Sequence, residues 1–313
     1  MGHADKTEPF PERKESIEGR QSKVHLGDFG SVPRDFSWFA ELRRMIPNIL
    51  RGRDLEDLSQ AIIAARRASR PVIWMMGAHV LKCGLGGLVC HLVRQGVVTG
   101  IGTNGAGAIH DLEIAMWGKT SEDVAEGLKT GMFGTTAETA SLFNDTARDC
   151  LDKGIGLGKG LGQALIDRKA PNSEVSVLAT ALRAGIPLTV HVAIGTDVVH
   201  EHDEADGKAI GYASMEDFRT FTSMIMGLGG GVVLNVGSAV IMPEVFLKAL
   251  AIARNRGADL GRFTTANFDM FALYRPMTNV VERPRLIGAT TYNFVGNHEI
   301  LLPVLVASVL SRA

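Results

Sequence analysis

The chain has 313 residues, a formal net charge of −1 and 45% hydrophobic residues. This length suits one large α/β domain or two small ones. The balanced charge does not favour nucleic acid or an anionic membrane as a partner. The three cysteines form no C-x-x-C pair and are typical of reduced thiols in a cytoplasmic protein. We therefore expect a small-molecule substrate as the partner.

Residues 1–30 are polar and predict an extended N-terminal arm, so that a single domain occupies residues 31–313. The N-terminus is charged and has no apolar stretch of the kind found in a signal peptide. Residues 220–243 contain no charged residue and resemble a membrane span in composition. Their five glycines and Asn235 favour a helix end, a strand and a second helix start instead.

Helix-like and strand-like segments alternate along the rest of the chain. Apolar residues at helical spacing predict helices within residues 35–70. Four short apolar runs then predict buried strands. Alternation of this kind is typical of a single doubly wound, mainly parallel α/β sheet with helices on both faces. The strand-like runs are 72–76, 97–101, 187–191 and 231–234, and the helix-like stretches among them are 84–94, 109–116 and 241–256.

Parallel sheets of this type bind ligands at the carboxyl ends of their strands. That rule selects His79 and Lys82 after the first run, residues 103–111 after the second, and residues 191–203 and 235–238 after the later two. The second of these segments is the most informative, because a strand, a glycine turn and a helix start leave backbone N–H groups free for an anion. Its candidate cofactor contacts are Thr103, Asn104, Gly105 and Gly107. The spacing is not G-x-G-x-x-G, so a phosphate loop and a ligand-free turn remain equal alternatives.

The same turn carries His110 and Asp111 as a candidate catalytic pair. An imidazole titrates near neutral pH and suits general acid–base catalysis, and a carboxylate can orient another group. The alternative is a surface histidine beside an aspartate that the helix dipole favours.

Several of these segments together resemble the deoxyhypusine synthase family. The resemblance rests on the order and spacing of residues 78–84, 103–112, 186–197, 228–233, 256–259 and 264–269. It implies a doubly wound NAD-binding fold, a homotetramer and transfer of an aminobutyl group from spermidine to a protein lysine. It also implies that Asp197 contacts cofactor or substrate. The further cofactor contacts that it implies are Gly230, Gly231, Thr264, Thr265 and Asp269.

Three departures from that family concern its chemistry. The family forms an imine on a lysine beyond the segment that matches residues 264–269, but this chain has no lysine after Lys248. Asn235 stands at the place of a family histidine. Ile109 and His110 stand at the place of two glutamates that would hold the polyamine. We therefore expect retained NAD binding with a different, non-polyamine substrate.

Two other functions remain alternatives. One is a true spermidine-dependent aminobutyl transferase, of the deoxyhypusine or homospermidine synthase type, that uses Lys82 or Lys248 as its amine. The other is an NAD-binding protein without turnover, because binding turns can outlast the loss of catalytic groups.

Two more segments have functional and structural interpretations. His200, His202 and Asp203 offer donors that suit a metal, but zinc-site spacing is absent and a solvated loop is favoured, so no metal is expected. The glycine run at residues 154–162 lacks both phosphate-loop patterns and is interpreted as a mobile structural loop.

The apolar stretches at residues 224–226 and 301–310 exceed what a domain of this size is expected to hide. We therefore predict a closed homo-oligomer, a tetramer, with His110 close to a subunit boundary. The alternative is that both stretches belong to the core.

Overall fold

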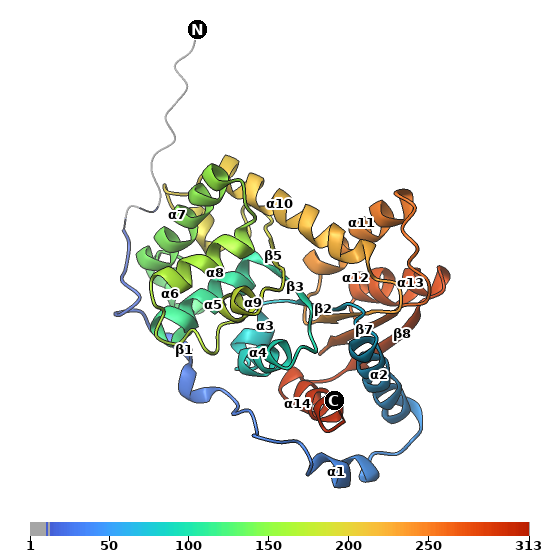
Figure 1. The fold of residues 1–313 in the computed structure, drawn as a ribbon. Helices are drawn as coiled ribbons and strands as arrows, with labels where there is room; N and C mark the ends of the chain where they lie inside the picture. Colours follow the sequence, from blue (N-terminus) through green and yellow to red (C-terminus); the bar gives the residue numbers. More distant parts are fainter. Residues whose placement is uncertain (1–10, 12, 313) are drawn as a thin grey trace.

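The computed structural model describes residue 11 and residues 13–312. A six-stranded parallel sheet forms the centre of the molecule (Figure 1). Its strands lie in the order β5-β3-β2-β6-β7-β8, and every neighbouring pair is parallel. The strands are β2 (Val72–Met76), β3 (Gly100–Asn104), β5 (Leu188–His191), β6 (Val232–Val236), β7 (Thr264–Asp269) and β8 (Thr290–Val295).

The chain fills this sheet from the middle outward in two directions. It begins at β2, adds β3 and β5 on one side, and then returns to place β6 on the other side of β2. The strands β7 and β8 extend that second half. This order reverses direction between β2 and β6, which is the arrangement of dinucleotide-binding doubly wound sheets.

Both faces of the sheet are covered. Along β2, Trp74 and Met76 pack into one hydrophobic cluster, whereas Ile73 and Met75 pack into a second cluster on the opposite face. Because successive side chains of a strand point to opposite faces, β2 needs an unbroken apolar run to be buried on both. The first face is covered mainly by α2 (Leu50–Arg67), α4 (Gly86–Arg94) and α14 (His298–Leu310), and the second by α10 (Gly207–Met226), α11 (Ile241–Asn255) and the π-helical η3 (Met277–Glu282).

A helical layer surrounds the β3–β5 end of the sheet, and a small antiparallel sheet joins it. That small sheet pairs β1 (Ser22–His25) with β4 (Lys119–Glu122). The helices there are α5 (Gly105–Trp117), α6 (Val124–Thr130), α7 (Ala137–Lys153), α8 (Leu157–Asp167) and α9 (Val177–Ala184). The remaining short elements are η1 (Leu26–Asp28), α1 (Phe39–Met45), α3 (His79–Lys82), η2 (Val198–Glu201), α12 (Tyr274–Pro276) and α13 (Arg283–Leu286).

The predicted α/β fold class is confirmed, and the predicted strand at residues 72–76 coincides with β2. Residues 220–243 divide as expected into the end of α10, β6 and the start of α11. None of the helices in the described part of the chain is long and apolar enough to cross a membrane.

The structure corrects the prediction for the glycine run and describes only part of the predicted N-terminal arm. The glycine run 154–162 is not a loop throughout, because α8 already begins at Leu157. Its glycines allow close packing: a Cβ on Gly158 would lie 2.1 Å from the carbonyl oxygen of Leu188. Of the predicted N-terminal arm, residues 1–10 and 12 lie outside the described residues. The described remainder includes β1 and the buried side chains of Ile17 and Arg20.

Candidate functional site

The ends of β2 and β6 meet where the strand order reverses. The backbone N–H of Gly77 donates a hydrogen bond to the carbonyl oxygen of Val236 at 3.0 Å. A Cβ on Gly77 would lie 2.2 Å from the carbonyl oxygen of Gly237, so only glycine allows this approach. The side of the sheet formed by the carboxyl ends of its strands, called the carboxyl edge below, therefore presents two closely packed turns. They lie at the position where such sheets bind dinucleotides.

The neighbouring turn from β3 into α5 is equally tight. The side chain of Asn104 caps α5 by accepting from the N–H of Gly107 at 2.9 Å. A Cβ on Gly107 would lie 2.1 Å from Thr103 Oγ1, and one on Gly105 would lie 2.0 Å from Asp197 Oδ2. The small residues of this turn are thus required by the side chains that pack against it.

Beside this turn lies a cavity of 180 Å³ with several polar side chains in its wall. They come from segments that are far apart in the sequence: the N-terminal segment, α3, α5, β4 and the connection after β5. A small concave site with convergent polar groups is the usual form of a ligand pocket. The polar wall residues are Arg20, Lys82, His110, Glu113, Ser121, Glu122, Thr196 and Asp197.

His110 is tied to a buried ion pair in the cavity wall. Its Nδ1 lies 2.6 Å from Thr120 Oγ1, and Thr120 Oγ1 donates to Glu113 Oε2 at 2.6 Å. Glu113 is held by both terminal nitrogens of Arg20, at 2.7 and 2.9 Å. Burial lowers the pKa of His110 to about 4, Glu113 opposes this effect, and the positive charges of Lys82 and Arg20 add to it. His110 is therefore a neutral imidazole at pH 7.

Asp197 supplies a carboxylate with one free acceptor. Its Oδ2 is buried and has no hydrogen-bond partner among the described residues. Burial raises the pKa of Asp197 to about 6, although a backbone hydrogen bond from Ala106 favours the charged form. A buried acceptor without a partner is costly, and this oxygen is packed against Gly105 at the start of α5.

Ser121 and Glu122 add strain and charge to the same wall. Ser121 has a φ of 62°, in the left-handed region that few non-glycine residues adopt, and its Oγ is buried without a partner among the described residues. Burial raises the pKa of Glu122, and a hydrogen bond from the N–H of Gly134 opposes that rise. Strain and unpaired polar atoms of this kind cluster at functional sites.

Asp111, the predicted partner of His110, is directed elsewhere. Its carboxylate accepts from Ser176 Oγ and from the N–H groups of Val177 and Leu178, at 2.5, 2.8 and 3.0 Å. These are the first residues of α9, so Asp111 fastens that helix to α5. Burial raises the pKa of Asp111 to about 6 against these hydrogen bonds. The contacts favour a structural role, and a catalytic role for Asp111 stays a prediction.

The predicted cofactor residues divide between the two edges of the sheet. Lys82 and the β3–α5 turn lie at the carboxyl edge with His79 and Asp269. The His79 ring packs edge-on against His298 at 5.5 Å, and its Nε2 lies 3.2 Å from Cys83 Sγ. Four others lie at the amino edge, where β6 and β7 begin, and are thus separated from the rest. These are Gly230, Gly231, Thr264 and Thr265.

The histidines after β5 have protein partners. His200 Nδ1 accepts from the N–H groups of Gly195 and Asp197, each at 3.2 Å, and His202 Nε2 lies 2.8 Å from the carbonyl oxygen of Gly134. In the described part of the chain, no three His, Cys, Asp or Glu side chains are grouped so that they could hold a metal ion. These contacts give the two histidines a role in fastening the connection after β5.

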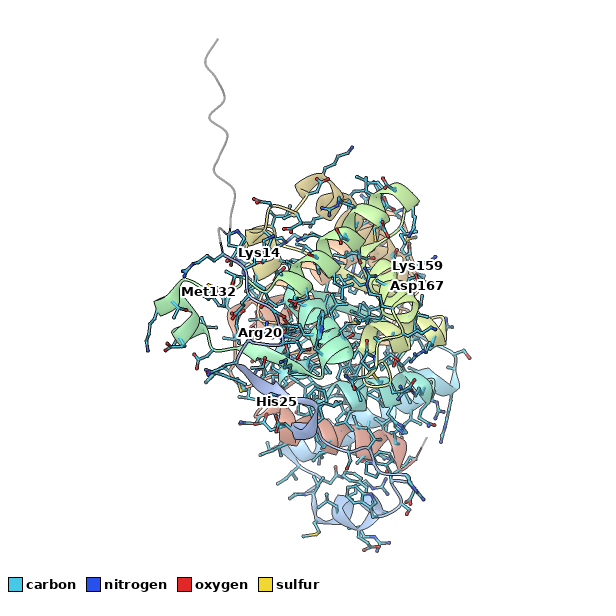
Figure 2. The ribbon with its side chains drawn as sticks, turned by 90° about the vertical axis from the view of Figure 1, so that its left-hand side faces the viewer. Lys14, Arg20, His25, Met132, Lys159 and Asp167 are labelled. Carbon is cyan, nitrogen blue, oxygen red and sulfur yellow. The ribbon has the colours of Figure 1, made fainter. Side chains whose placement is uncertain are left out.

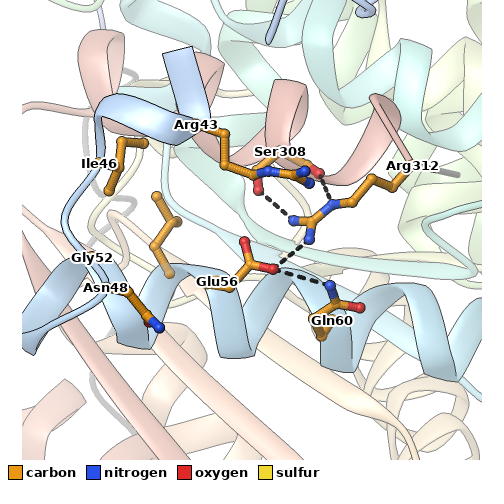
Figure 3. Close-up of a pocket in the computed structure, with 9 residues that line it drawn as sticks. Arg43, Ile46, Asn48, Gly52, Glu56, Gln60, Ser308 and Arg312 are labelled. Carbon is orange, nitrogen blue, oxygen red and sulfur yellow. Dashed lines mark hydrogen bonds and ion pairs between the residues drawn. The ribbon is translucent and has the colours of Figure 1, made fainter. Parts of the chain in front are cut away.

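Of four larger cavities among the described residues, one of 390 Å³ lies after β5 and β6 and has a mainly apolar wall, and one of 230 Å³ lies beside Arg20 and Glu122. The two largest lie away from the carboxyl edge. One, of 440 Å³, lies between α1, α2 and α14 (Figure 3). Its Glu56 already accepts from Arg312 and Gln60. The other, of 540 Å³, lies beside the start of α8, where Asp217 accepts from the N–H groups of Gly158 and Val190. Neither brings unpaired polar groups together as the cavity at His110 does.

Sequence reasoning missed Arg20, Glu113, Thr120 and Ser121. Glu113 follows His110 by three residues, so both lie on one face of α5, and this spacing was a usable signal. Arg20 lies 93 residues from Glu113 in a polar segment, and no local pattern connects them. Figure 2 shows Arg20 on the N-terminal segment where it crosses this face of the molecule.

No family model and no curated protein matches the chain. Among solved structures, a "putative deoxyhypusine synthase" from Entamoeba histolytica is similar, with 13% identity, 90% of this chain and 97% of that chain covered, and a TM-score of 0.53. A "conserved putative LOR/SDH protein" from Methanococcus maripaludis S2 has 15% identity, coverages of 89% and 73%, and a TM-score of 0.51. These likenesses show the fold alone.

AgrE, solved as a ternary complex with ornithine and NAD⁺, is similar at 16% identity over 89% of this chain, with a TM-score of 0.52. The chain spans only 34% of the length of AgrE and 32% of that of the arginine dihydrolase ArgZ. The shared part is therefore one segment of those larger proteins.

The carboxyl edge fits NAD on three counts. The strand order reverses there, the turns at Gly77 and Gly105 leave no room for a Cβ, and Lys82 adds a cation close by. In addition, Thr103 Oγ1 and His298 Nδ1 are buried at this edge without partners among the described residues. Unpaired polar atoms at the strand ends are what a polar cofactor would satisfy.

Proposed function

We propose that this chain is an NAD-dependent enzyme that acts on a small amino acid at the cavity beside His110. The observation that carries the proposal is the convergence of Lys82, His110 and the unpaired Asp197 next to the strand-order reversal. The presence of NAD⁺ and ornithine in the structure of AgrE supports it.

The charges of the cavity wall suit a zwitterion. Asp197, from the connection after β5, would accept from the substrate ammonium group, and Lys82, from α3, would bind the carboxylate. A volume of 180 Å³ has room for one small molecule. The opposite charges of Asp197 and Lys82 favour a free amino acid, which carries both an ammonium and a carboxylate group.

His110 would take the substrate proton. As a neutral imidazole in the cavity wall it can accept a proton from the reacting amine or hydroxyl. When bound, NAD supplies the hydride chemistry. The chain's own part is to orient the substrate through Asp197 and Lys82 and to hold the proton at His110.

Lys82 also keeps the aminobutyl transferase as a second candidate. It is a lysine in the wall of the cavity, whereas Lys248 is exposed on α11 and paired with Glu244. An imine on Lys82 would be trapped by borohydride reduction after incubation with spermidine and NAD. Absence of a trapped adduct would remove this candidate.

The first test is calorimetry with NAD⁺ and NADH, followed by an absorbance screen for NADH formation from ornithine, lysine, proline and related amino acids. We expect His110→Gln to abolish turnover and to retain NAD binding. The exposed His25, exchanged to Gln, is the matched control and should leave both unchanged. No binding of either nucleotide at millimolar concentration would refute the proposal, and binding without turnover would leave a non-catalytic NAD-binding protein.

A further inference from the structure

We infer that Thr120 and Glu113 are positioning residues that hold His110 in one tautomer, with its proton on Nδ1 and Nε2 left as the acceptor. The tautomer follows from hydrogen-bond geometry alone. Its use in chemistry rests on the proposed function.

The argument begins at Glu113, whose carboxylate accepts from four donors. Oε1 accepts from Arg20 Nη1 at 2.7 Å and from Thr139 Oγ1 at 2.8 Å. Oε2 accepts from Arg20 Nη2 at 2.9 Å and from Thr120 Oγ1 at 2.6 Å. A carboxylate has about four acceptor positions and, when ionised, no donor. Each position of Glu113 is therefore filled.

Glu113 must be ionised for this arrangement. Burial alone raises the pKa of Glu113, but the hydrogen bonds and charge of Arg20 outweigh burial and hold it below its usual value. Both side chains are almost fully buried, at 5% and 3% exposed, so the pair is shielded from water. A protonated Glu113 would lose its two-pronged contact with Arg20.

The direction of the next hydrogen bond follows. A threonine hydroxyl has a single hydrogen, and that of Thr120 is committed to Glu113. Thr120 Oγ1 can then only accept from His110 at their separation of 2.6 Å. Nδ1 must therefore carry the proton, and in a neutral imidazole Nε2 carries the lone pair.

This arrangement prepares His110 to take a proton. Protonation of Nε2 produces an imidazolium whose Nδ1–H remains bound to Thr120, one hydroxyl away from the Glu113 carboxylate. Burial, with the positive charges of Lys82 and Arg20, keeps the pKa of His110 low, so the ring is neutral at pH 7 and its Nε2 is free to accept a proton. The N-terminal segment thus contributes to the site through Arg20.

The test is ¹⁵N NMR of histidine-labelled protein at pH 7, with the His110 signals assigned by their loss in His110→Gln. We expect a protonated Nδ1 and an unprotonated Nε2 in the unmodified protein. Thr120→Val removes the acceptor and should reduce the Nδ1–H population several-fold, whereas Thr120→Ser should restore it. Thr146→Val, which removes another buried threonine hydroxyl on α7, is the control.

An Nε2–H tautomer in the unmodified protein, or an unchanged tautomer in Thr120→Val, would overturn the inference. Both outcomes are independent of NAD and substrate, so they are distinct from failure of the proposed function. Where turnover is measurable, Thr120→Val should lower kcat at least tenfold with little change in KM, and Thr120→Ser should recover it.

Discussion

If Asp197 binds the substrate ammonium group as proposed, binding must depend on pH. Because burial raises its pKa to about 6, it is mostly ionised at pH 7 and mostly protonated at pH 5 in the free protein. A ligand ammonium group needs the ionised form. We therefore expect the affinity for ornithine to fall about tenfold from pH 7 to pH 5, and binding at pH 6 to release protons.

Calorimetry in buffers of different ionisation enthalpy measures both effects. Asp197→Asn should bind more weakly and lose the pH dependence, whereas Asp152→Asn on the exposed face of α7 should behave like the unmodified protein. An affinity in the unmodified protein that is equal at pH 5 and pH 7 would exclude Asp197 as the ammonium site.

Replacement of Asp111 tests whether its carboxylate stabilises the fold, although Asp111 is next to His110 in the sequence. Replacing it with Ala leaves Ser176 Oγ and the first N–H groups of α9 without their acceptor. We expect a loss of about 2–4 kcal/mol in the free energy of unfolding, measured by urea denaturation. Asp152→Ala should change it by less than about 0.5 kcal/mol. A stable Asp111→Ala protein without turnover would instead favour the catalytic prediction.

At the scale of elements, the start of α5 is determined by the side chain that packs on it. Gly105 and Gly207 are both the first residue of a helix, but a Cβ on Gly105 would lie 2.0 Å from Asp197 Oδ2, whereas one on Gly207 would meet nothing within 4 Å. We expect Gly105→Ala to displace Asp197 and weaken ornithine binding at least tenfold.

The matched Gly207→Ala should leave ornithine binding unchanged and keep the thermal midpoint within about 2 °C. Calorimetry and thermal unfolding of both variants measure these effects. Equal ornithine affinity in Gly105→Ala and Gly207→Ala would mean that ornithine binding does not depend on the packing of Asp197 against α5.

The strands differ in how well the sequence predicts them. β2 is an unbroken apolar run and was predicted to the residue, but β7 and β8 were not predicted as strands. Each carries a polar residue where a buried strand is expected to be apolar. In the fold, Asn235, Asn267 and Asn293 stand in register on β6, β7 and β8 and bond to one another at 2.8 and 2.9 Å. Only the pairing of the strands makes these amides compatible with burial.

The residues of the candidate site also differ in how well the sequence predicts them. The strand-end rule selected Lys82, His110 and Asp197, because strand direction can be inferred from alternating elements. It did not select Arg20, Glu113 and Thr120, whose roles depend on contacts between distant segments. Gly230 and Thr264 came from the family resemblance, and they lie where their strands begin.

At the scale of the whole molecule, the apolar surface is not where the sequence suggested. Ile225, Leu302, Leu305 and Val309 are buried in the two hydrophobic clusters, so the stretches at 224–226 and 301–310 belong largely to the core. In addition to those at residues 38–50, at Leu128 and at Leu286, several large exposed apolar side chains follow strands at the carboxyl edge. They are Ile194 after β5, Val240 after β6, Phe271 and Tyr274 after β7, and Ile300 after β8.

An apolar rim at the carboxyl edge favours a second subunit there over free solvent. We therefore keep the prediction of a homo-oligomer with the site near a subunit boundary. Light scattering at micromolar concentration should give a multiple of 33.6 kDa, the mass of one chain.

Phe271→Glu, which places a charge in the rim, should shift the protein toward the monomer and weaken ligand binding. Leu286→Glu, at a side chain 84% exposed on α13 near the opposite edge, should do neither. A particle of 33.6 kDa in the unmodified protein would refute the shared edge, and the rim would then be ordinary exposed surface.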